Sequence, residues 1–199
     1  MLAKIVDFMF NLFKRGYTLP TNWFFFLVQG VGFSEFPRVA GILNIKNRGK
    51  ISIGKSVKIT SCSNSNPVGG AQETSLYCSP EGSITIGDNV SISNCVIFSQ
   101  KNIKIKKGAM IGGGCQIYDS DFHSLIVEER LKEVPETIGR AAVVIGNNSF
   151  IGCNVIILKG TVIGENCVIG AGSVVSGNIP KNQIWAGNPA VFIRDINQN

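Results

Sequence analysis

The single histidine of the chain, His123, lies in the segment that carries the clearest candidates for acid–base chemistry. The segment reads YDSDFH from Tyr118, so Asp119 and Asp121 precede the histidine at alternate positions. Histidine has an ordinary pKa of about 6.5 and can accept a proton near pH 7. A carboxylate can hold its tautomer and stabilise the imidazolium that forms. On an extended segment all three side chains would project to one face. His123 is thus a candidate base, with Asp121 or Asp119 to orient it; the alternative is an ordinary exposed loop histidine.

Composition narrows the class of protein before any fold is considered. The 199 residues suffice for one domain with a core, and a single histidine excludes zinc sites built from several imidazoles. The net charge of +6 fits an anionic partner: a phosphate-bearing cofactor, a nucleic acid or a membrane surface. The six cysteines form no C-x-x-C pair, which predicts reduced thiols in a cytoplasmic protein.

A six-residue repeat organises most of the chain. Small or β-branched residues stand four positions after most of the repeating aliphatic residues, for example at Ser149 and Cys167, and glycine often follows directly. The step from Phe98 to Ile105 is seven, which gives one coil an extra residue. The repeating positions are Ile53 and Ile59; Ile86, Ile92 and Phe98; Ile105, Ile111 and Ile117; and Ile145, Ile151, Ile157, Ile163, Ile169 and Val175.

This period matches neither a helix nor a simple alternating strand. It predicts a solenoid in which three hexapeptides close one coil of about 18 residues and each aliphatic residue stacks on the next coil. Glycine and asparagine would occupy the corners, where φ is positive.

Departures from the repeat define the expected organisation of the chain. Residues 1–40 form an N-terminal helical and apolar segment, 41–190 the solenoid, and 191–199 a tail. Two insertions, 61–82 and 124–142, project as loops. The apolar run after Trp23 is too short to span a bilayer. We expect the N-terminal segment to pack on the domain or a neighbouring subunit, or to rest on a membrane.

The closing repeats, IGAGSVV, NIPKN and WAGNPA between Ile169 and Ala190, resemble those of hexapeptide-repeat acetyltransferases. The segment ending at His123 resembles the D-x-D-x-H motif of the polysaccharide O-acetyltransferases in this family. The resemblance implies an all-β, left-handed parallel β-helix, acetyl-CoA as co-substrate without a metal, and a homotrimer with active sites between subunits. It also implies that His123 is the general base and that one of the two aspartates orients it while the other binds an acceptor hydroxyl.

Cofactor contacts carry over by position along the resemblance. They fall at Phe150, Cys153, Ala171, Ser176 and Arg194, with Lys181 near the phosphates and bare corners at Gly152, Gly170 and Gly172 for the pantetheine arm. Relatives often carry a lysine where this chain has Gly177, which puts one phosphate contact in doubt. Trp185 either packs near the cofactor or caps the solenoid. Ser93 or Asn94 is the expected acceptor contact.

The function implied is acetylation of a sugar hydroxyl in bacterial capsule, lipopolysaccharide or exopolysaccharide synthesis, in the cytoplasm or at the inner face of the membrane. His123 would assist direct attack on the thioester; a covalent route through Cys115 or Cys153 is the competing mechanism. Competing functions are an N-acyltransferase of an amino sugar nucleotide, an antibiotic acetyltransferase and a non-enzymatic scaffold. No nucleic-acid partner is expected. Zinc carbonic anhydrases of this fold use three histidines, which the chain lacks.

Overall fold

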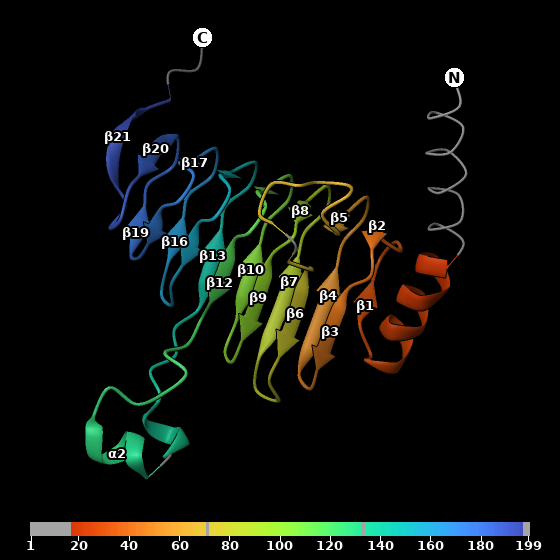
Figure 1. Ribbon diagram of the computed structural model, residues 1–199. Helices are drawn as coiled ribbons and strands as arrows, with labels where there is room; N and C mark the ends of the chain where they lie inside the picture. Colours follow the sequence, from red (N-terminus) through yellow and green to blue (C-terminus); the bar gives the residue numbers. More distant parts are fainter. Residues whose placement is uncertain (1–16, 71, 133, 197–199) are drawn as a thin grey trace.

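The computed structural model describes residues 17–70, 72–132 and 134–196, which form a three-sided parallel β-helix (Figure 1). We call its sides sheets A, B and C. Sheet A contains β1 (Gly32–Phe33), β4 (Lys50–Ile53), β7 (Ser83–Ile86), β10 (Ile103–Ile105), β13 (Val143–Ile145), β16 (Val162–Ile163) and β19 (Asn178–Ile179). Sheet B contains β2 (Arg38–Gly41), β5 (Lys58–Ser61), β8 (Ser91–Ser93), β11 (Met110–Ile111), β14 (Phe150–Ile151), β17 (Val168–Ile169), β20 (Gln183–Ala186) and β21 (Val191–Asp195). Sheet C contains β3 (Asn44–Asn47), β6 (Ser75–Cys78), β9 (Val96–Ser99), β12 (Gln116–Tyr118), β15 (Ile156–Ile157) and β18 (Val174–Val175).

The predicted aliphatic columns run through the centre of the solenoid. In sheet A the parallel register stacks Ile86, Ile105, Ile145 and Ile163, all of which are buried. The small residues four positions later, including Ser149 and Cys167, are fully buried as well. Each coil thus buries its apolar side chains against the coils above and below, as a solenoid requires.

One column differs from the prediction. The inward residue of β9 is Ile97, which pairs with Ile117, whereas Phe98 points outward and stacks on Tyr77. The step from Ile92 to the next inward residue is therefore five, not six. The coil from Ile86 to Ile105 still has one residue more than the coil from Ile145 to Ile163, because the step from Ile97 to Ile105 is eight and more than offsets the short step before β9.

Corners of the solenoid hold the left-handed residues that the repeat predicts. Asn148, Asn154 and Asn166 have φ of 55°, 56° and 55°. Asparagine tolerates this region better than other residues with a side chain. Asn166 also donates to the Oδ1 of Asn182 in the next coil at 3.1 Å.

A helix caps the N-terminal end of the solenoid, and its described part covers residues 17–28 (Figure 1). Asn22 is buried beneath it, where its side chain donates to the carbonyl of Gly41 at 2.9 Å and accepts from the amide of Leu43 at 3.0 Å. The solenoid begins before the expected boundary at residue 41, because β1 and β2 already pair with the second coil. Among the described residues, no helix has the length and apolarity that crossing a bilayer requires.

The C-terminal end is closed by a hairpin rather than a tail. Strand β21 pairs antiparallel with β20, so residues 191–195 belong to sheet B. Trp185 continues the inward column after Ile169, packs against the core and meets Phe192 edge-on at 6.2 Å. Trp185 therefore caps the solenoid.

The two insertions differ in shape. The first is shorter than expected, because Ser75–Cys78 forms β6. Residues 62–70 and 72–74 fold back on the coils, and the side chain of Asn94 donates to the carbonyl of Asn66 at 2.8 Å. The second forms an arm that projects from the solenoid and carries α2 (Val127–Leu131) and a 3-10 turn, Pro135–Thr137 (Figure 1).

Candidate active site

Asp119 is a structural residue at the base of the arm. Its carboxylate is fully buried and accepts three hydrogen bonds, from the hydroxyl of Ser99 at 2.7 Å and from the amides of Gln100 at 2.7 Å and Lys101 at 2.9 Å. These donors hold the corner that follows β9 against the corner that follows β12. The carboxylate therefore faces the preceding coil and not His123, which removes the geometric basis for assigning it to orient the base or bind an acceptor.

Asp121 lies at the neck of the arm, where the chain leaves and re-enters the solenoid. Its amide donates to the carbonyl of Gly139 at 2.9 Å, and Ser120 forms an antiparallel bridge with Arg140. The Asp121 carboxylate lies 3.3 Å from the ammonium of Lys159, which follows β15 in the next coil. Sequence reasoning missed Lys159, since nothing in the sequence links it to the distant D-x-D-x-H segment.

Phe122 breaks the extended conformation expected between Asp121 and His123. Its φ is +65°, which is an outlier for a bulky residue and is found mainly where the surrounding structure enforces it. The ring meets Phe98 and Tyr118 at centroid distances of 4.9 and 5.2 Å, and the amide donates to the hydroxyl of Ser120 at 3.0 Å. Because the left-handed residue turns the chain, Asp121 points to Lys159 whereas His123 enters the arm.

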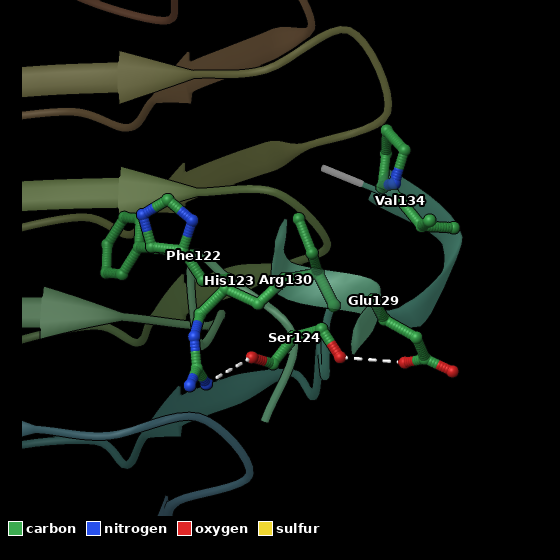
Figure 2. A pocket seen from close by; sticks show the side chains of 8 residues that line it. Phe122, His123, Ser124, Glu129, Arg130 and Val134 are labelled. Carbon is green, nitrogen blue, oxygen red and sulfur yellow. Dashed lines mark hydrogen bonds between the residues drawn. The ribbon is translucent and has the colours of Figure 1, made fainter. Parts of the chain in front are cut away.

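His123 is exposed and lines an open pocket of about 310 Å³ between the turn and the arm (Figure 2). Ser124, directly after it, is buried and holds the arm closed: its hydroxyl donates to Glu129 at 2.8 Å, and its carbonyl accepts from Arg130 at 3.0 Å (Figure 2). The pocket is lined by Phe122, His123, Ser124, Glu129, Arg130, Val134, Pro135 and Ile138.

The residues expected to bind the cofactor lie on several corners of one chain. Phe150 lies on β14 of sheet B, and Cys153 and Ala171 lie at the edge between sheets B and C; Phe150 and Ala171 are exposed. Ser176 follows β18 at the edge between sheets C and A, which is the edge that carries the arm and His123. Lys181 lies at the third edge, before β20. One chain thus presents the candidate base and most of the expected cofactor contacts on different edges.

Arg194 lies on the C-terminal strand β21, apart from the three corner groups. Its side chain is exposed and contacts only the carbonyl of Asp195, at 3.3 Å, among the hydrogen bonds of the described residues. A guanidinium in this state is available to an anionic group such as a phosphate.

Coil stacking accounts for two of the three glycines expected beside the cofactor. A Cβ on Gly152 would lie 2.6 Å from the amide nitrogen of Ala171, and one on Gly170 would lie 2.7 Å from the Cβ of Ala186. Gly172 has φ of +71° and open space around it, so this corner offers bare backbone to a ligand.

The expected acceptor contacts do not lie beside His123. Ser93 ends β8 and Asn94 follows it, at the edge between sheets B and C and not at the edge that carries the arm. Asn94 is buried beneath the first insertion, with φ of 45°, and its carbonyl accepts from the side chain of Gln72 at 3.2 Å. Its role in the chain is that of a corner residue that anchors the first insertion.

The two cysteines considered as nucleophiles, Cys115 and Cys153, differ in burial. Cys115 is fully buried and its thiol contacts the carbonyl of Gly152 at 3.0 Å, so no substrate reaches it. Burial raises the pKa of Cys95 well above the ordinary thiol value. Cys153 is half-buried beside Phe150. No cluster of three histidine, cysteine or acidic side chains suited to a metal occurs within the described part of the chain.

Comparisons with known proteins agree with a parallel β-helix built from hexapeptide repeats. Residues 142–177 match the family model described as bacterial transferase hexapeptide (six repeats). The chain thus carries the hexapeptide repeat of bacterial transferases, and its resemblance to hexapeptide-repeat acetyltransferases is confirmed.

Two curated relatives match part of the chain. A putative acetyltransferase of Saccharomyces cerevisiae is 39% identical over 127 residues, which is 63% of each chain. A putative lipopolysaccharide biosynthesis O-acetyl transferase of Escherichia coli is 36% identical over 58% of this chain and 62% of its own length. The chain matches just under two thirds of the length of these relatives.

Solved structures confirm the left-handed β-helix. A galactoside acetyltransferase in complex with coenzyme A is 34% identical, with a TM-score of 0.52 over 57% of this chain and 56% of that one. A hexapeptide-repeat acetyltransferase of Vibrio cholerae, at 21% identity, has a TM-score of 0.60 over 94% of this chain and 91% of its own.

Proposed function

We propose that the protein transfers an acetyl group from acetyl-CoA to a hydroxyl of a sugar, with His123 as general base. The observation that carries the proposal is the placement of the chain's only histidine, exposed at a pocket and presented by a strained turn at Phe122. Backbone strain of this kind is retained mainly at functional sites. The galactoside acetyltransferase bound to coenzyme A and the lipopolysaccharide O-acetyl transferase relative support the reaction and the acceptor class, and through the latter a role in bacterial surface polysaccharide synthesis.

In the proposed reaction, the neutral imidazole of His123 takes the proton of the acceptor hydroxyl while its oxygen attacks the thioester carbonyl. A carbon–oxygen bond forms, the carbon–sulfur bond breaks, and the proton held by His123 passes to the departing thiolate. The products are the acetyl ester and coenzyme A, so the step balances without a covalent enzyme intermediate. The burial of Cys115 favours this direct route over a cysteine nucleophile.

We infer that the active site forms between copies of the chain in a homotrimer. His123 stands at one edge of the solenoid, whereas Phe150, Cys153 and Ala171 stand at another. One acetyl-CoA can meet both groups when the arm edge of one copy faces the other edge of its neighbour. The exposed apolar side chains of Met110 and Phe150, paired on sheet B, fit a contact of this kind.

The chain's own residues suit a pantetheine arm and a nucleotide. Phe150 offers an apolar surface, and the open space at Gly172 lets a ligand approach the backbone closely. Arg194 and Lys181 are exposed cations that can contact phosphates.

The test is release of the coenzyme A thiol from acetyl-CoA in the presence of a panel of glycosyl acceptors, with hydroxyl-only and amino sugars in parallel. His123→Ala should lower kcat by about 10²- to 10⁴-fold, because removal of a general base has effects of this size. Leu131→Ala, on the exposed tip of the same arm, is the control and should keep activity.

Three results bear against the proposal. The proposal would be refuted if a folded trimer released no thiol from acetyl-CoA with any acceptor in the panel. Unchanged turnover in His123→Ala would refute it as well. Acetylation of amines but not hydroxyls would assign the site to the N-acyltransferase class instead.

A further inference from the structure

The helix at the N-terminal end of the solenoid turns an apolar face outward. Leu19, Trp23 and Leu27 recur at four-residue spacing, and with Phe24 and Val28 they are each between 54% and 65% exposed. We call these five residues the apolar face. The opposite side of the helix, with Asn22 and Phe26, is buried against the first coil.

The orientation of this helix is fixed by hydrogen bonds and not only by packing. Asn22 bonds both the carbonyl of Gly41 and the amide of Leu43, and Phe26 meets Phe33 and Phe36 at centroid distances of 5.8 and 5.1 Å. The apolar face cannot rotate inward without breaking these contacts. It is therefore presented to the surroundings by the folded domain.

A ring of positive charge surrounds the same end. The six cations of the first two coils are all exposed, and none forms an ion pair within the described residues. Only one acidic residue, Glu35, occurs between residues 32 and 58. We call this set the basic collar; it consists of Arg38, Lys46, Arg48, Lys50, Lys55 and Lys58.

The apolar face and the basic collar lie close enough to act on one surface. Neighbouring strands are about 4.8 Å apart, so two coils place the collar within roughly 10 Å of the helix-bearing end. That distance is about one Debye length at physiological salt, over which charges still act on a surface.

We propose that this end of the protein docks on an anionic lipid membrane, with the apolar face in the interface and the basic collar over the headgroups. Interfacial helices bury an apolar face with aromatic residues at the headgroup level, and adjacent cations strengthen binding to anionic lipid. A second copy fits less well, because a two-fold contact through the apolar face would bring two basic collars together. The proposal stands on residues remote from His123 and does not depend on the proposed reaction.

Flotation of the full chain with vesicles tests the proposal. The vesicles contain either phosphatidylcholine alone or phosphatidylcholine with about a third phosphatidylglycerol. We expect binding to the anionic vesicles that falls as salt rises. Trp23→Ser with Leu27→Ser should weaken it more than about tenfold, since two exposed apolar anchors are lost. Arg48→Glu with Lys50→Glu should weaken it by at least about twentyfold, at about fivefold for each positive charge removed.

Matched controls separate the docking end from general apolarity and charge. Leu125→Ser with Leu131→Ser changes two exposed leucines on the arm, and Lys104→Glu with Lys106→Glu changes two exposed cations in mid-solenoid. Both control variants should bind vesicles within about threefold of the parent, because their charges and apolar groups lie outside the docking end.

Failure has clear forms. No binding of the parent chain to anionic vesicles overturns the proposal, as does equal loss in the control variants. A fall in molecular mass in solution for the Trp23 and Leu27 variant, without vesicle binding by the parent, would assign the apolar face to a contact between copies. Because the collar variant leaves the helix unchanged, the proposal remains testable even if the helix variant fails to fold.

Discussion

Exchange of the two aspartates for asparagine separates a structural carboxylate from one at the site. In Asp119→Asn, an amide nitrogen, which can only donate, replaces one carboxylate oxygen. Both oxygens of Asp119 accept hydrogen bonds: one from Ser99 and Lys101, the other from Gln100. At least one buried donor loses its partner. An unsatisfied buried donor costs about 1–3 kcal/mol, and a hydrogen bond to a charged group contributes about 1.5–3 kcal/mol.

We therefore expect Asp119→Asn to lower the free energy of unfolding by about 3 kcal/mol. For a chain of this length that corresponds to a fall in Tm of roughly 6–12 °C. Asp121→Asn loses only the partly exposed ion pair with Lys159, which contributes about 0.2–1 kcal/mol. Ser99→Ala is a graded control that removes one donor to Asp119 and keeps its charge; about 1 kcal/mol is expected.

Urea unfolding followed by circular dichroism gives the stabilities, and thiol release from acetyl-CoA gives kcat at a temperature where all variants are folded. We expect Asp119→Asn to be the less stable variant and to retain the larger share of kcat per folded molecule. The reasoning is refuted if Asp119→Asn unfolds like the parent, or if it loses more kcat than Asp121→Asn while both remain folded.

Two further predictions concern packing and thiol access. Gly152→Ala should lower the free energy of unfolding by about 1–3 kcal/mol, because its Cβ would lie 2.6 Å from the amide nitrogen of Ala171. Gly172→Ala lies in open space at φ +71° and should cost about 1–2 kcal/mol of backbone strain. A larger effect at Gly172 than at Gly152 in urea unfolding would contradict the packing argument. Iodoacetamide at mildly alkaline pH should label the half-buried Cys62 and Cys153 first, since burial shields the other four thiols and raises the pKa of three of them, Cys78, Cys95 and Cys167. Mass spectrometry of peptides from native and urea-unfolded protein checks the order, and fast labelling of Cys115 in the native protein would revive the cysteine mechanism.

The repeat made the fold predictable because the residue types within each hexapeptide indicate its local conformation. An inward aliphatic residue, a small residue four positions later and a corner asparagine or glycine recur with little dependence on distant residues. The prediction was wrong at Phe98, because Ile97 and Phe98 are adjacent apolar residues and either could point inward. The register with Ile117 decides for Ile97, and that pairing is a property of neighbouring coils.

The site was less predictable, because its geometry depends on contacts between coils. The spacing of Asp119, Asp121 and His123 suggested one face, but the left-handed turn at Phe122 separates His123 from Asp121. Hydrogen bonds to the preceding coil bury Asp119 apart from both. The ring of Phe122 packs against Phe98 in the preceding coil, and the carboxylate of Asp121 pairs with Lys159 in the following coil. Neither partner can be inferred from the spacing of the motif.

The sequence by itself determined the solenoid, the order of its coils and the single histidine as candidate base. These features depend on short-range periodicity and on composition. Only the tertiary structure decided that Asp119 is a buried clamp, that Trp185 closes the C-terminal end, and that the helix at the other end turns its apolar face outward beside a ring of cations. Such roles follow from burial and hydrogen-bond partners. Both are fixed by the way that successive coils stack, which brings together residues that lie far apart in the chain.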